Sequence, residues 1–410
     1  MTEYGLLGET LGHSFSPELH KALAGYDYAL LPTPRDAVED LLRKREFRGL
    51  NVTIPYKQAV IPLCDEVDPR ALAIGAVNTI VNRNGRLIGY NTDIDGFRYM
   101  AKRAGAELSG KKVLILGSGG TSRTVQAAAR ELNAAEIVVI SRSGENNYQN
   151  LSRHSDAEVI VNTTPVGMYP RLVGQSPIDL HKLPRVEAVF DMVYNPARTA
   201  LLQEAYKLGI PACNGLLMLV AQAKESAEWF TGTAICNDRI EQIHRQLRRQ
   251  KENIILVGMP GCGKSTVAKV LAMGTGKETV DADAAIVAAA GKSIPEIFAQ
   301  EGEEAFRALE TQVLAELGKR SGIIIATGGG CVTREENYPS LHQNGQIFWL
   351  QRDISQLPTN GRPISQANDL GKLYEVRRPL YQAFADHAVC NDTTPEETAN
   401  KILQYLTQQE

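Results

Sequence analysis

The chain has 410 residues, a formal net charge of −3 and a charged fraction of 22%. This length allows two or three domains, each with its own core. The small net charge gives no reason to expect nucleic acid or a membrane surface as a partner, and it leaves the oligomeric state open. No apolar run is long enough to span a bilayer, and the six cysteines form no C-x-x-C pair. The sequence therefore predicts a cytoplasmic protein that binds small molecules.

A polar loop follows the first predicted strand, residues 4–7, and precedes a helix that begins at Pro17. Ser14 and Ser16 lie in this loop, where two hydroxyls can bind a carboxylate or a polyol. Ser16 also has a structural interpretation, because a serine directly before a proline at the first helical position is typical of a helix N-cap. Ser14 has no such alternative.

A predicted strand at residues 50–54 alternates apolar and polar side chains, and Lys57 stands at its exit. A lone lysine at such a place is usually a solvated cation. Farther on, residues 79–90 predict a hairpin around an Asn-Gly turn. Asn78 directly precedes this hairpin and Asp93 closely follows it, so we expect their side chains to lie close together.

A dinucleotide-binding unit is predicted from the order strand 112–116, glycine loop, helix and strand 136–140. The loop glycines that would approach the cofactor are Gly117, Gly119 and Gly120. A carboxylate at the end of the second strand would favour NAD, but this chain has Ser141 and Arg142 there. A hydroxyl and a guanidinium suit a 2′-phosphate, which favours NADP.

Two later segments complete this unit. A strand at residues 189–192 leads into a loop, and the carboxyl ends of parallel strands bind ligands in such sheets, so Met192 and Tyr194 are candidate cofactor contacts. The apolar helix that begins near Gly215 carries one early polar side chain, Gln222.

The motifs of this half occur in the order seen in shikimate dehydrogenases, and the resemblance covers residues 3–249. They are H-S-x-S-P from residue 13, G-x-N-V-T-x-P-x-K from 49, G-A-V-N-T from 75, N-T-D from 91, G-x-G-G-x-S-R from 117, N-T-T-P-x-G-M from 162 and G-L-x-M-L-V-x-Q-A from 215. The resemblance implies NADPH-dependent reduction of 3-dehydroshikimate, with Lys57 and Asp93 as the catalytic pair. The substrate contacts that it implies are Ser14, Ser16, Thr53, Asn78 and Gln222. Two positions depart from the family pattern, Leu217 and Ser141.

A phosphate-binding loop of the pattern G-x-x-x-x-G-K-S begins at Gly258, between an apolar strand and a helix. Glycines let successive backbone N–H groups point at phosphate oxygens, and the helix N-terminus adds partial positive charge. Lys264 would reach the outer phosphates of ATP, and Ser265 would bind Mg²⁺. The other ATP-binding candidates in this loop are Gly261, Gly263 and Thr266.

Two carboxylates, Asp281 and Asp283, follow the next short strand. Either can cap the helix that begins after them, and the pair can also divide the work between Mg²⁺ and a hydroxyl nucleophile. Further candidates downstream are Arg307, Gly329, Gly330, Arg362 and Arg377. Two guanidiniums such as Arg307 and Arg377 suit a carboxylate.

Residues 253–407 resemble shikimate kinase. The resemblance assigns Asp281 to the magnesium side and Asp283 to the attacking hydroxyl. It also implies that Arg307, Arg377 and the backbone at Gly329 and Gly330 bind shikimate, and that Arg362 closes over ATP from a lid. The segment between Trp349 and Arg362 is short for this family. Arg352 is the available substitute for an arginine that often packs on adenine.

The predicted fold class is α/β throughout. An α/β substrate domain at residues 1–109 precedes a Rossmann domain at 110–249, and a P-loop kinase domain at 253–410 follows a helix at 237–249 and a join at 250–252. We expect a bifunctional enzyme that reduces 3-dehydroshikimate with NADPH and phosphorylates shikimate with ATP and Mg²⁺. Two alternatives stay open: an NAD-using quinate/shikimate dehydrogenase fused to the kinase, and a regulator in which one half only binds shikimate-type ligands.

Overall fold

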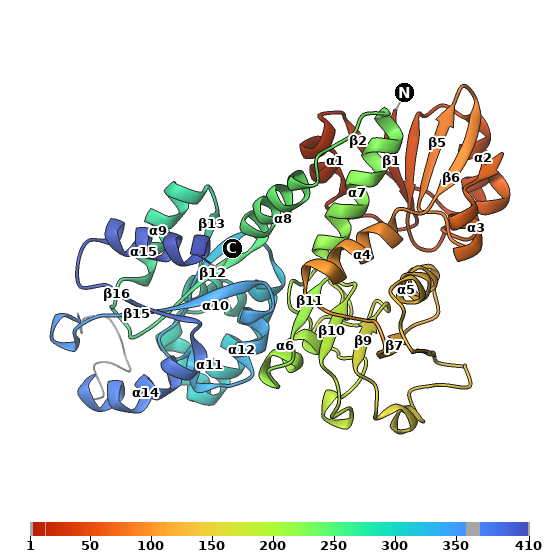
Figure 1. The fold of residues 1–410 in the computed structure, drawn as a ribbon. Coiled ribbons are helices and arrows are strands. Elements are labelled where there is room, and N and C mark those ends of the chain that lie inside the picture. Colours follow the sequence, from red (N-terminus) through yellow and green to blue (C-terminus); the bar gives the residue numbers. More distant parts are fainter. Residues whose placement is uncertain (1–2, 13, 358–369, 409–410) are drawn as a thin grey trace. The chain divides into compact units, whose positions relative to one another are not determined.

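The computed structural model describes residues 3–12, 14–357 and 370–408 and contains three β-sheets (Figure 1). Arg362 lies outside the described residues. The chain forms two compact units: the first contains residues 1–168, 175–194 and 201–246, and the second contains residues 169–174, 195–200 and 247–410. None of the described helices is both long and apolar enough to cross a membrane.

The N-terminal sheet of the first unit is mixed. Its strands, in order across the sheet, are β2 (Tyr28–Pro32), β1 (Tyr4–Gly8), β3 (Gly49–Val52), β5 (Thr79–Arg83), β6 (Arg86–Tyr90) and β4 (Glu66–Val67). The associated helices are α1 (Ser16–Ala24), α2 (Val38–Lys44) and α3 (Pro69–Ile74). The predicted hairpin is confirmed: β5 and β6 pair antiparallel, and both turn residues, Asn84 (φ 52°) and Gly85 (φ 84°), adopt the left-handed conformation that such a turn requires.

The second sheet of the first unit is parallel and confirms the dinucleotide-binding architecture. Its strands, in order, are β11 (Ala212–Asn214), β10 (Ala188–Asp191), β9 (Val159–Asn162), β7 (Lys112–Leu116) and β8 (Glu136–Ile140). The associated helices are α4 (Asp93–Arg103), α5 (Gly120–Glu131), α6 (Ala200–Lys207) and α7 (Leu216–Thr231). The strand order reverses at β7, because β8 lies on one side of it and β9 on the other. Ligands bind at such a reversal, beyond the carboxyl ends of the strands.

Helices α4 and α7 lie side by side and connect the two sheets (Figure 1). Gly96 permits this approach, because a Cβ atom there would lie 2.7 Å from the carbonyl oxygen of Met218 and 3.0 Å from Cβ of Gln222. Asp93 at the start of α4 and Gln222 on α7 are therefore brought to the same region of the first unit.

The second unit contains a parallel five-stranded sheet. Its strands, in order, are β13 (Glu278–Asp281), β14 (Ile323–Ala326), β12 (Asn253–Val257), β15 (Gly345–Gln351) and β16 (His387–Cys390). Its helices are α9 (Lys264–Thr275), α10 (Ala282–Ala290), α11 (Ile294–Lys319), α12 (Asn337–His342), α14 (Leu370–Phe384) and α15 (Pro395–Gln408). The central strand β12 is fully buried from Ile254 to Val257, so the glycine loop that follows it starts from a rigid position.

The join between the two halves is shorter than the predicted one. Helix α8 (Asp238–Lys251) continues through Gln250 and Lys251, and only Glu252 separates it from β12. Both residues are good helix formers, and no glycine or proline stops the helix before them. Three apolar residues at helical spacing on α8, Ile240, Ile243 and Leu247, are buried.

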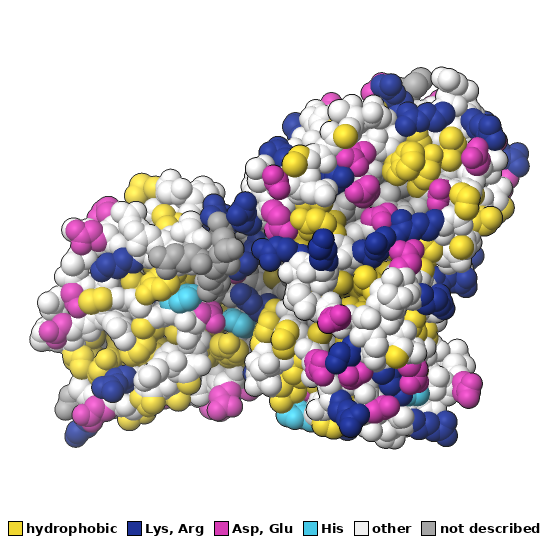
Figure 2. Space-filling view, viewed as in Figure 1, with side chains coloured by type: hydrophobic (Ala, Val, Ile, Leu, Met, Phe, Trp, Pro, Cys, Tyr) yellow, Lys and Arg dark blue, Asp and Glu magenta, His cyan; other side chains and the backbone are white. Residues whose placement is uncertain are grey.

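Charges of both signs are interspersed over the face of the molecule in Figure 2. Many of them form local pairs in the structure; Arg70, for example, binds Asp95 at 2.9 Å and Glu131 at 3.1 Å. Each such exposed pair contributes little to stability.

Candidate active sites

Lys57 and Asp93 form an ion pair in the first unit. Lys57 lies in the turn after β3 and Asp93 is the first residue of α4, and Nζ of Lys57 is 2.6 Å from Oδ2 of Asp93. Both side chains are largely buried, with exposed fractions of 13% and 9%. The lysine stem also lies beside the glycine loop, because a Cβ atom on Gly120 would be 3.4 Å from Cβ of Lys57. The ammonium is thus held by a carboxylate next to the predicted cofactor loop.

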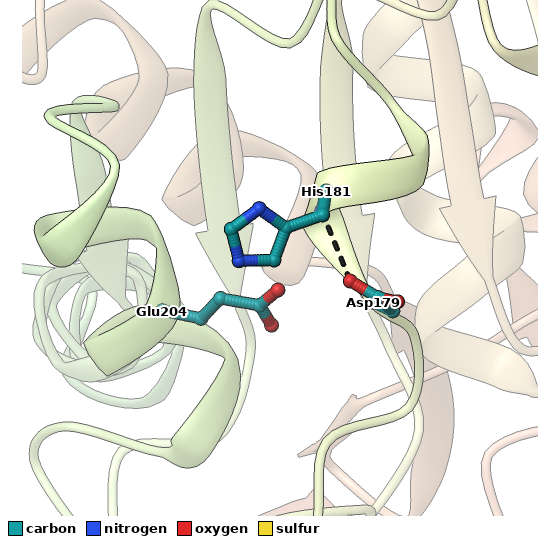
Figure 3. Close-up of side chains that lie close together, drawn as sticks. All are labelled: Asp179, His181 and Glu204. Carbon is teal, nitrogen blue, oxygen red and sulfur yellow. Dashed lines mark hydrogen bonds between the residues drawn. The ribbon is translucent and has the colours of Figure 1, made fainter.

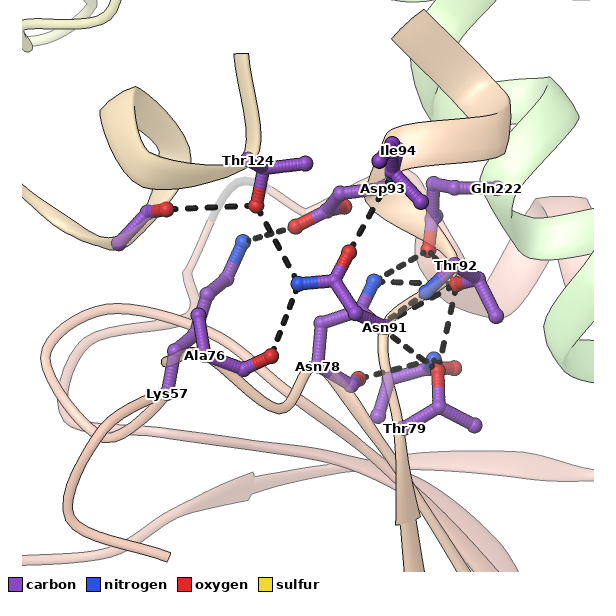
Figure 4. A network of polar contacts seen from close by, with 12 residues as sticks. Lys57, Ala76, Asn78, Thr79, Asn91, Thr92, Asp93, Ile94, Thr124 and Gln222 are labelled. Carbon is purple, nitrogen blue, oxygen red and sulfur yellow. Dashed lines mark hydrogen bonds and ion pairs between the residues drawn. The ribbon is translucent and has the colours of Figure 1, made fainter. Parts of the chain in front are cut away.

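Asn78 and Gln222 belong to one network of hydrogen bonds (Figure 4). The backbone N–H of Thr92 donates to Oδ1 of Asn78 at 2.7 Å, and Nδ2 of Asn78 donates to Oγ1 of Thr92 at 3.0 Å and to Oε1 of Gln222 at 3.4 Å. Nε2 of Gln222 donates to the carbonyl oxygen of Leu219 at 2.9 Å. These bonds determine which end of each amide carries the donors.

Ser14 and Ser16 hydrogen-bond to each other, with Oγ of Ser14 donating to Oγ of Ser16 at 3.1 Å. The interpretation of Ser16 as an N-cap is wrong: α1 begins at Ser16 itself, after Phe15, and no side chain caps it. The hydroxyl of Ser16 is engaged with Ser14 instead. Within the described residues, neither serine hydrogen-bonds to Lys57 or to the network around Asn78.

Thr53 lies directly after β3, where its backbone N–H donates to the carbonyl oxygen of Leu7 at 2.9 Å. Its methyl group lies beside Gly8, at which a Cβ atom would come within 2.6 Å of it. The structure therefore places Thr53 against the start of the loop that carries Ser14.

The glycine loop after β7 leads directly into the N-terminus of α5. Gly117 has a positive φ of 103°, and a Cβ atom there would lie 2.9 Å from Oγ1 of Thr163. Gly119 faces open space, and Gly120 is the first residue of α5. A pyrophosphate can therefore approach the backbone at the N-terminus of this helix, which is the arrangement that a dinucleotide needs.

The other predicted cofactor residues flank this loop. Ser141 and the exposed Arg142 follow β8, where the backbone N–H of Ser141 donates to the carbonyl oxygen of Asn146 at 3.1 Å. Met192 follows β10, and its backbone N–H donates to the carbonyl oxygen of Asn162 at 2.9 Å. The ring of Tyr194 lies 5.1 Å from that of Phe15, and burial raises the pKa of Tyr194 to about 12, so it stays neutral.

The phosphate-binding loop of the second unit holds its own lysine. Nζ of Lys264 donates to the carbonyl oxygens of Gly258 at 2.8 Å and Met259 at 3.0 Å. Gly261 (φ 86°) and Gly263 (φ 98°) adopt the left-handed conformation that curls the loop, and the backbone N–H of Thr266 donates to the carbonyl oxygen of Gly263 at 3.1 Å. Glycines in this conformation let the backbone N–H groups of such a loop face phosphate oxygens at the start of the helix that follows.

Ser265 and Asp281 offer two oxygens to a magnesium ion. Oγ of Ser265 donates to Oδ2 of Asp281 at 2.9 Å. Oδ1 of Asp281 caps α10, since it accepts from the backbone N–H groups of Asp283 at 3.1 Å and Ala284 at 3.2 Å. The helix-cap and magnesium interpretations of Asp281 are thus compatible, because each uses a different carboxylate oxygen. Oxygen donors of this kind suit Mg²⁺.

Asp283 and Arg307 meet around a buried carboxylate, Glu310. Nη1 of Arg307 binds Oε2 of Glu310 at 2.7 Å. A Cβ atom on Gly328 would lie 2.8 Å from Oδ1 of Asp283 and equally close to Oε1 of Glu310, so both oxygens border one point. Burial raises the pKa of Glu310, although the Arg307 guanidinium opposes this shift.

Arg377 lies on the opposite side of the glycine run, on α14. Its Nη1 donates to the carbonyl oxygen of Gly329 at 3.1 Å, and Tyr381 donates to the same oxygen. The neighbouring Gly330 lies against the guanidinium of Arg307, so no side chain fits there. Gly329 thus contacts Arg377, and the adjacent Gly330 contacts Arg307.

Comparisons with known proteins agree with these two sites. The family model of the shikimate dehydrogenase substrate binding domain matches residues 6–80, and that of shikimate kinase matches residues 260–407. An NADP-dependent shikimate dehydrogenase of Halothermothrix orenii is 38% identical over 263 residues, which cover 56% of this chain and 90% of the relative. The chain belongs to the shikimate dehydrogenase family.

Solved structures of shikimate dehydrogenases have the same fold over this part. Shikimate dehydrogenase 1 of Peptoclostridium difficile is 33% identical, covers 60% of this chain and is itself covered to 98%, with a TM-score of 0.57. The shikimate dehydrogenase of Thermus thermophilus, solved with NADP(H) and shikimate, is 33% identical over 60% of this chain and 99% of its own, with a TM-score of 0.54. The remainder of the chain is a shikimate kinase domain, so this member of the family is a fusion of the two.

Several residues of the shikimate dehydrogenase and kinase sites did not emerge from the sequence. Thr92 lies inside the N-T-D motif, but its role in orienting Asn78 is visible only from the hydrogen bonds. Glu310 follows Arg307 by one helical turn, a spacing at which opposite charges pair on a helix. Asn391 donates to the carbonyl oxygen of Cys262 in the phosphate-binding loop, and no sequence pattern indicated it.

A further group of possible metal ligands, Asp179, His181 and Glu204, lies near β10 and α6 of the dehydrogenase part (Figure 3). The local fold already uses both carboxylates. Asp179 accepts from the backbone N–H of His181 at 3.1 Å, and Glu204 accepts from that of Leu180 at 2.8 Å. Lys182 also lies 3.4 Å from Asp179. The group is therefore explained as the support of the short turn Leu180–Lys182.

Proposed function

We propose that this protein catalyses two consecutive reactions of the shikimate pathway: reduction of 3-dehydroshikimate to shikimate with NADPH, and phosphorylation of shikimate to shikimate 3-phosphate with ATP and Mg²⁺. The observation that carries this proposal is that one chain holds a lysine–aspartate pair beside a dinucleotide loop and a phosphate-binding loop beside a two-arginine site. The product of the first site is the substrate of the second.

In the reductase site, Lys57 acts as the general acid. NADPH supplies a hydride to the ketone carbon when it is bound. The Lys57 ammonium then gives its proton to the ketone oxygen as negative charge develops there, and Asp93, 2.6 Å away, keeps the ammonium oriented. Ser14, Ser16, Thr53, Asn78 and Gln222 bind the carboxylate and hydroxyls of the substrate.

We assign the cofactor loop to NADP, with Gly117, Gly119 and Gly120 at the pyrophosphate. The exposed guanidinium of Arg142, beside Ser141, supports a 2′-phosphate contact, since no carboxylate stands there to bind a ribose hydroxyl. Met192 and Tyr194 border the nicotinamide. Parallel assays with NADPH and NADH separate this proposal from a quinate/shikimate dehydrogenase that uses NAD.

In the kinase site, Asp283 accepts the proton of the attacking shikimate hydroxyl. ATP supplies the phosphoryl group and Mg²⁺ screens its charge. Arg307, Arg377 and the backbone at Gly329 and Gly330 bind the shikimate carboxylate, while Ser265 and Asp281 provide oxygens for the metal. Lys264 leaves the carbonyl oxygens of its own loop to bind the outer phosphates. Arg362, outside the described residues, is assigned to the lid that closes over ATP.

The domain assignment follows from these sites. We propose that residues 1–109 bind 3-dehydroshikimate, residues 110–249 bind NADP, and residues 253–410 form the kinase. All six cysteines are free, which supports a reducing compartment and hence the cytoplasm.

One incubation of the protein with 3-dehydroshikimate, NADPH, ATP and Mg²⁺, with products identified by mass, tests the proposal. We expect shikimate 3-phosphate, shikimate alone when ATP is left out, and no product when NADPH is left out. Accumulation of shikimate in the complete mixture would contradict the kinase assignment. Binding of substrates without any turnover would instead favour a regulator.

A further inference from the structure

A set of buried polar groups lies behind Asn78 and Gln222 and is not explained by substrate binding. At its centre is Ser226, fully buried on α7 one helical turn after Gln222. Its Oγ has four polar neighbours: the carbonyl oxygen of Gln222 at 3.0 Å, Nδ2 of Asn51 at 2.8 Å, Oγ1 of Thr79 at 2.9 Å and Oγ1 of Thr92 at 3.0 Å. These neighbours come from β3, β5, the start of α4 and α7.

These neighbours satisfy every hydrogen bond that the Ser226 hydroxyl can make. Ser226 donates its single proton to the carbonyl oxygen of Gln222, and its lone pairs accept from Asn51 and from one of the two threonines. Asn51 cannot turn over, because its Oδ1 accepts from the hydroxyl of Tyr28 at 2.8 Å. The bond to Tyr28 therefore holds the Asn51 amide with its Nδ2 group toward Ser226.

The same threonines contact the two amides that face the substrate. Oγ1 of Thr79 donates to Oδ1 of Asn78 at 3.1 Å, and Oγ1 of Thr92 accepts from Nδ2 of Asn78 at 3.0 Å (Figure 4). Ser226 is thus linked to Asn78 by two hydrogen bonds through Thr79 or Thr92, and it shares a helix face with Gln222. Because buried polar networks are rigid when every member is satisfied, a change at Ser226 is transmitted to both amides.

We propose that Ser226 is a positioning residue of the reductase site, which holds Asn78 and Gln222 in the orientation that receives the hydroxyl groups of 3-dehydroshikimate. This inference rests on the proposed reductase function. Ser226 itself does not touch the substrate; it acts through Asn78, Thr92 and Gln222. A serine that only fills the core would affect folding without a preference for one substrate.

Steady-state kinetics of Ser226→Ala and Ser226→Cys, in the full chain without ATP, test the proposal. We expect the KM for the ketone substrate to rise about tenfold, as for the loss of one buried hydrogen bond. The kcat and the KM for NADPH should stay within about twofold, because Lys57 and the cofactor loop are untouched. Thr231→Ala is the matched control, since Thr231 makes the same bond to the preceding helical turn, to the carbonyl oxygen of Ala227 at 2.8 Å, outside the network.

A double-mutant cycle with Asn78→Ala shows whether Ser226 acts through Asn78. If it does, Ser226→Ala should raise the KM for the ketone by less than about threefold in the Asn78→Ala background, because the effects of substitutions at coupled residues are not additive. Additive effects in the cycle would overturn the proposal. The kinase activity of each variant, measured with shikimate and ATP, reports the amount of intact chain in the same sample.

An unchanged KM for the ketone substrate in Ser226→Ala overturns the proposal. A rise in both KM values together with an equally large fall in kcat also overturns it. If Ser226→Ala does not fold, Ser226→Cys, which leaves no cavity but accepts hydrogen bonds weakly, decides by the same criteria. Absence of reductase turnover in the unaltered chain is a different result, because it removes the proposed function itself.

Discussion

The two sites hold their lysines in different ways. Lys57 is paired with a carboxylate, Asp93, on a neighbouring element. Lys264 instead donates to the carbonyl oxygens of its own loop, at Gly258 and Met259. An ammonium between carbonyl dipoles can exchange them for phosphate oxygens when a nucleotide arrives, whereas an ammonium beside a carboxylate already has the partner that it needs.

The polar groups around the two lysines also differ in how far they are buried. Behind the reductase site, Asn78, Thr92 and Ser226 are buried and satisfied by one another. In the kinase site, Asp281 and Asp283 are exposed. The polar groups behind the reductase site are therefore buried and bonded to one another, whereas the two aspartates of the kinase site face solvent. Substitutions in each site test this difference.

The largest effect is expected for Lys57→Ala. Loss of the general acid should lower the turnover number of the reductase by about 10³-fold. Measurement of NADPH oxidation checks this, and the kinase activity of the same sample should be unchanged. A reductase rate close to that of the unaltered chain would show that Lys57 is not the proton donor.

Asp283→Asn should slow the turnover of shikimate phosphorylation by about 10²-fold, because the amide cannot accept the hydroxyl proton. The KM for ATP should change little, since the proposal places Asp283 at the shikimate hydroxyl and not at the phosphate-binding loop. A coupled ADP assay measures both constants. A large rise in the KM for ATP with normal turnover would move Asp283 to the magnesium site.

The buried His20 predicts that the N-terminal sheet loses stability in acid. This histidine is buried on α1, stacks on Tyr28 at 4.0 Å, and burial lowers its pKa to about 3. Because the pKa of His20 is lower in the folded chain, its contribution to the free energy of unfolding is fully present above the unfolded pKa of 6.5. The fold loses this contribution as the pH falls from 6.5 toward 3. Between pH 7 and pH 5 the expected loss is about 2 kcal/mol.

Urea unfolding at the two pH values measures this loss. The chain has two tryptophans, so Trp349→Phe leaves Trp229, which stacks on Tyr90 at 4.0 Å, as a reporter of the first unit. His20→Gln in this background should remove most of the pH dependence. Equal pH dependence with and without His20 would place the acid-sensitive group elsewhere.

The smallest effect is expected for Arg142→Ala. Loss of one exposed charged contact to a 2′-phosphate should raise the KM for NADPH about tenfold and leave the KM for NADH unchanged. Kinetics with both cofactors check this, and Arg153→Ala, a basic residue farther along the same connection, is the control. Equal changes with NADPH and NADH would contradict the 2′-phosphate assignment.

Much of the fold followed from local patterns. The Asn-Gly turn between β5 and β6 and the glycine loops after β7 and β12 each need backbone conformations or approaches that few residues allow, so their sequences indicate them directly. The N-cap interpretation of Ser16 failed because its hydroxyl bonds to Ser14, a contact outside the helix rules. The roles of individual site residues stay predictions.

The three α/β domains, the two glycine loops and the family resemblance could be predicted from the sequence, because they depend on short-range periodicity and spacing. Which polar atoms meet depends instead on tertiary packing. Ser226 and Asn51 are 175 positions apart in the chain, and Glu310 meets Asp283 only across Gly328. Such contacts depend on how α7 packs on β3 and how α11 packs beside β14, and no local pattern encodes those distances.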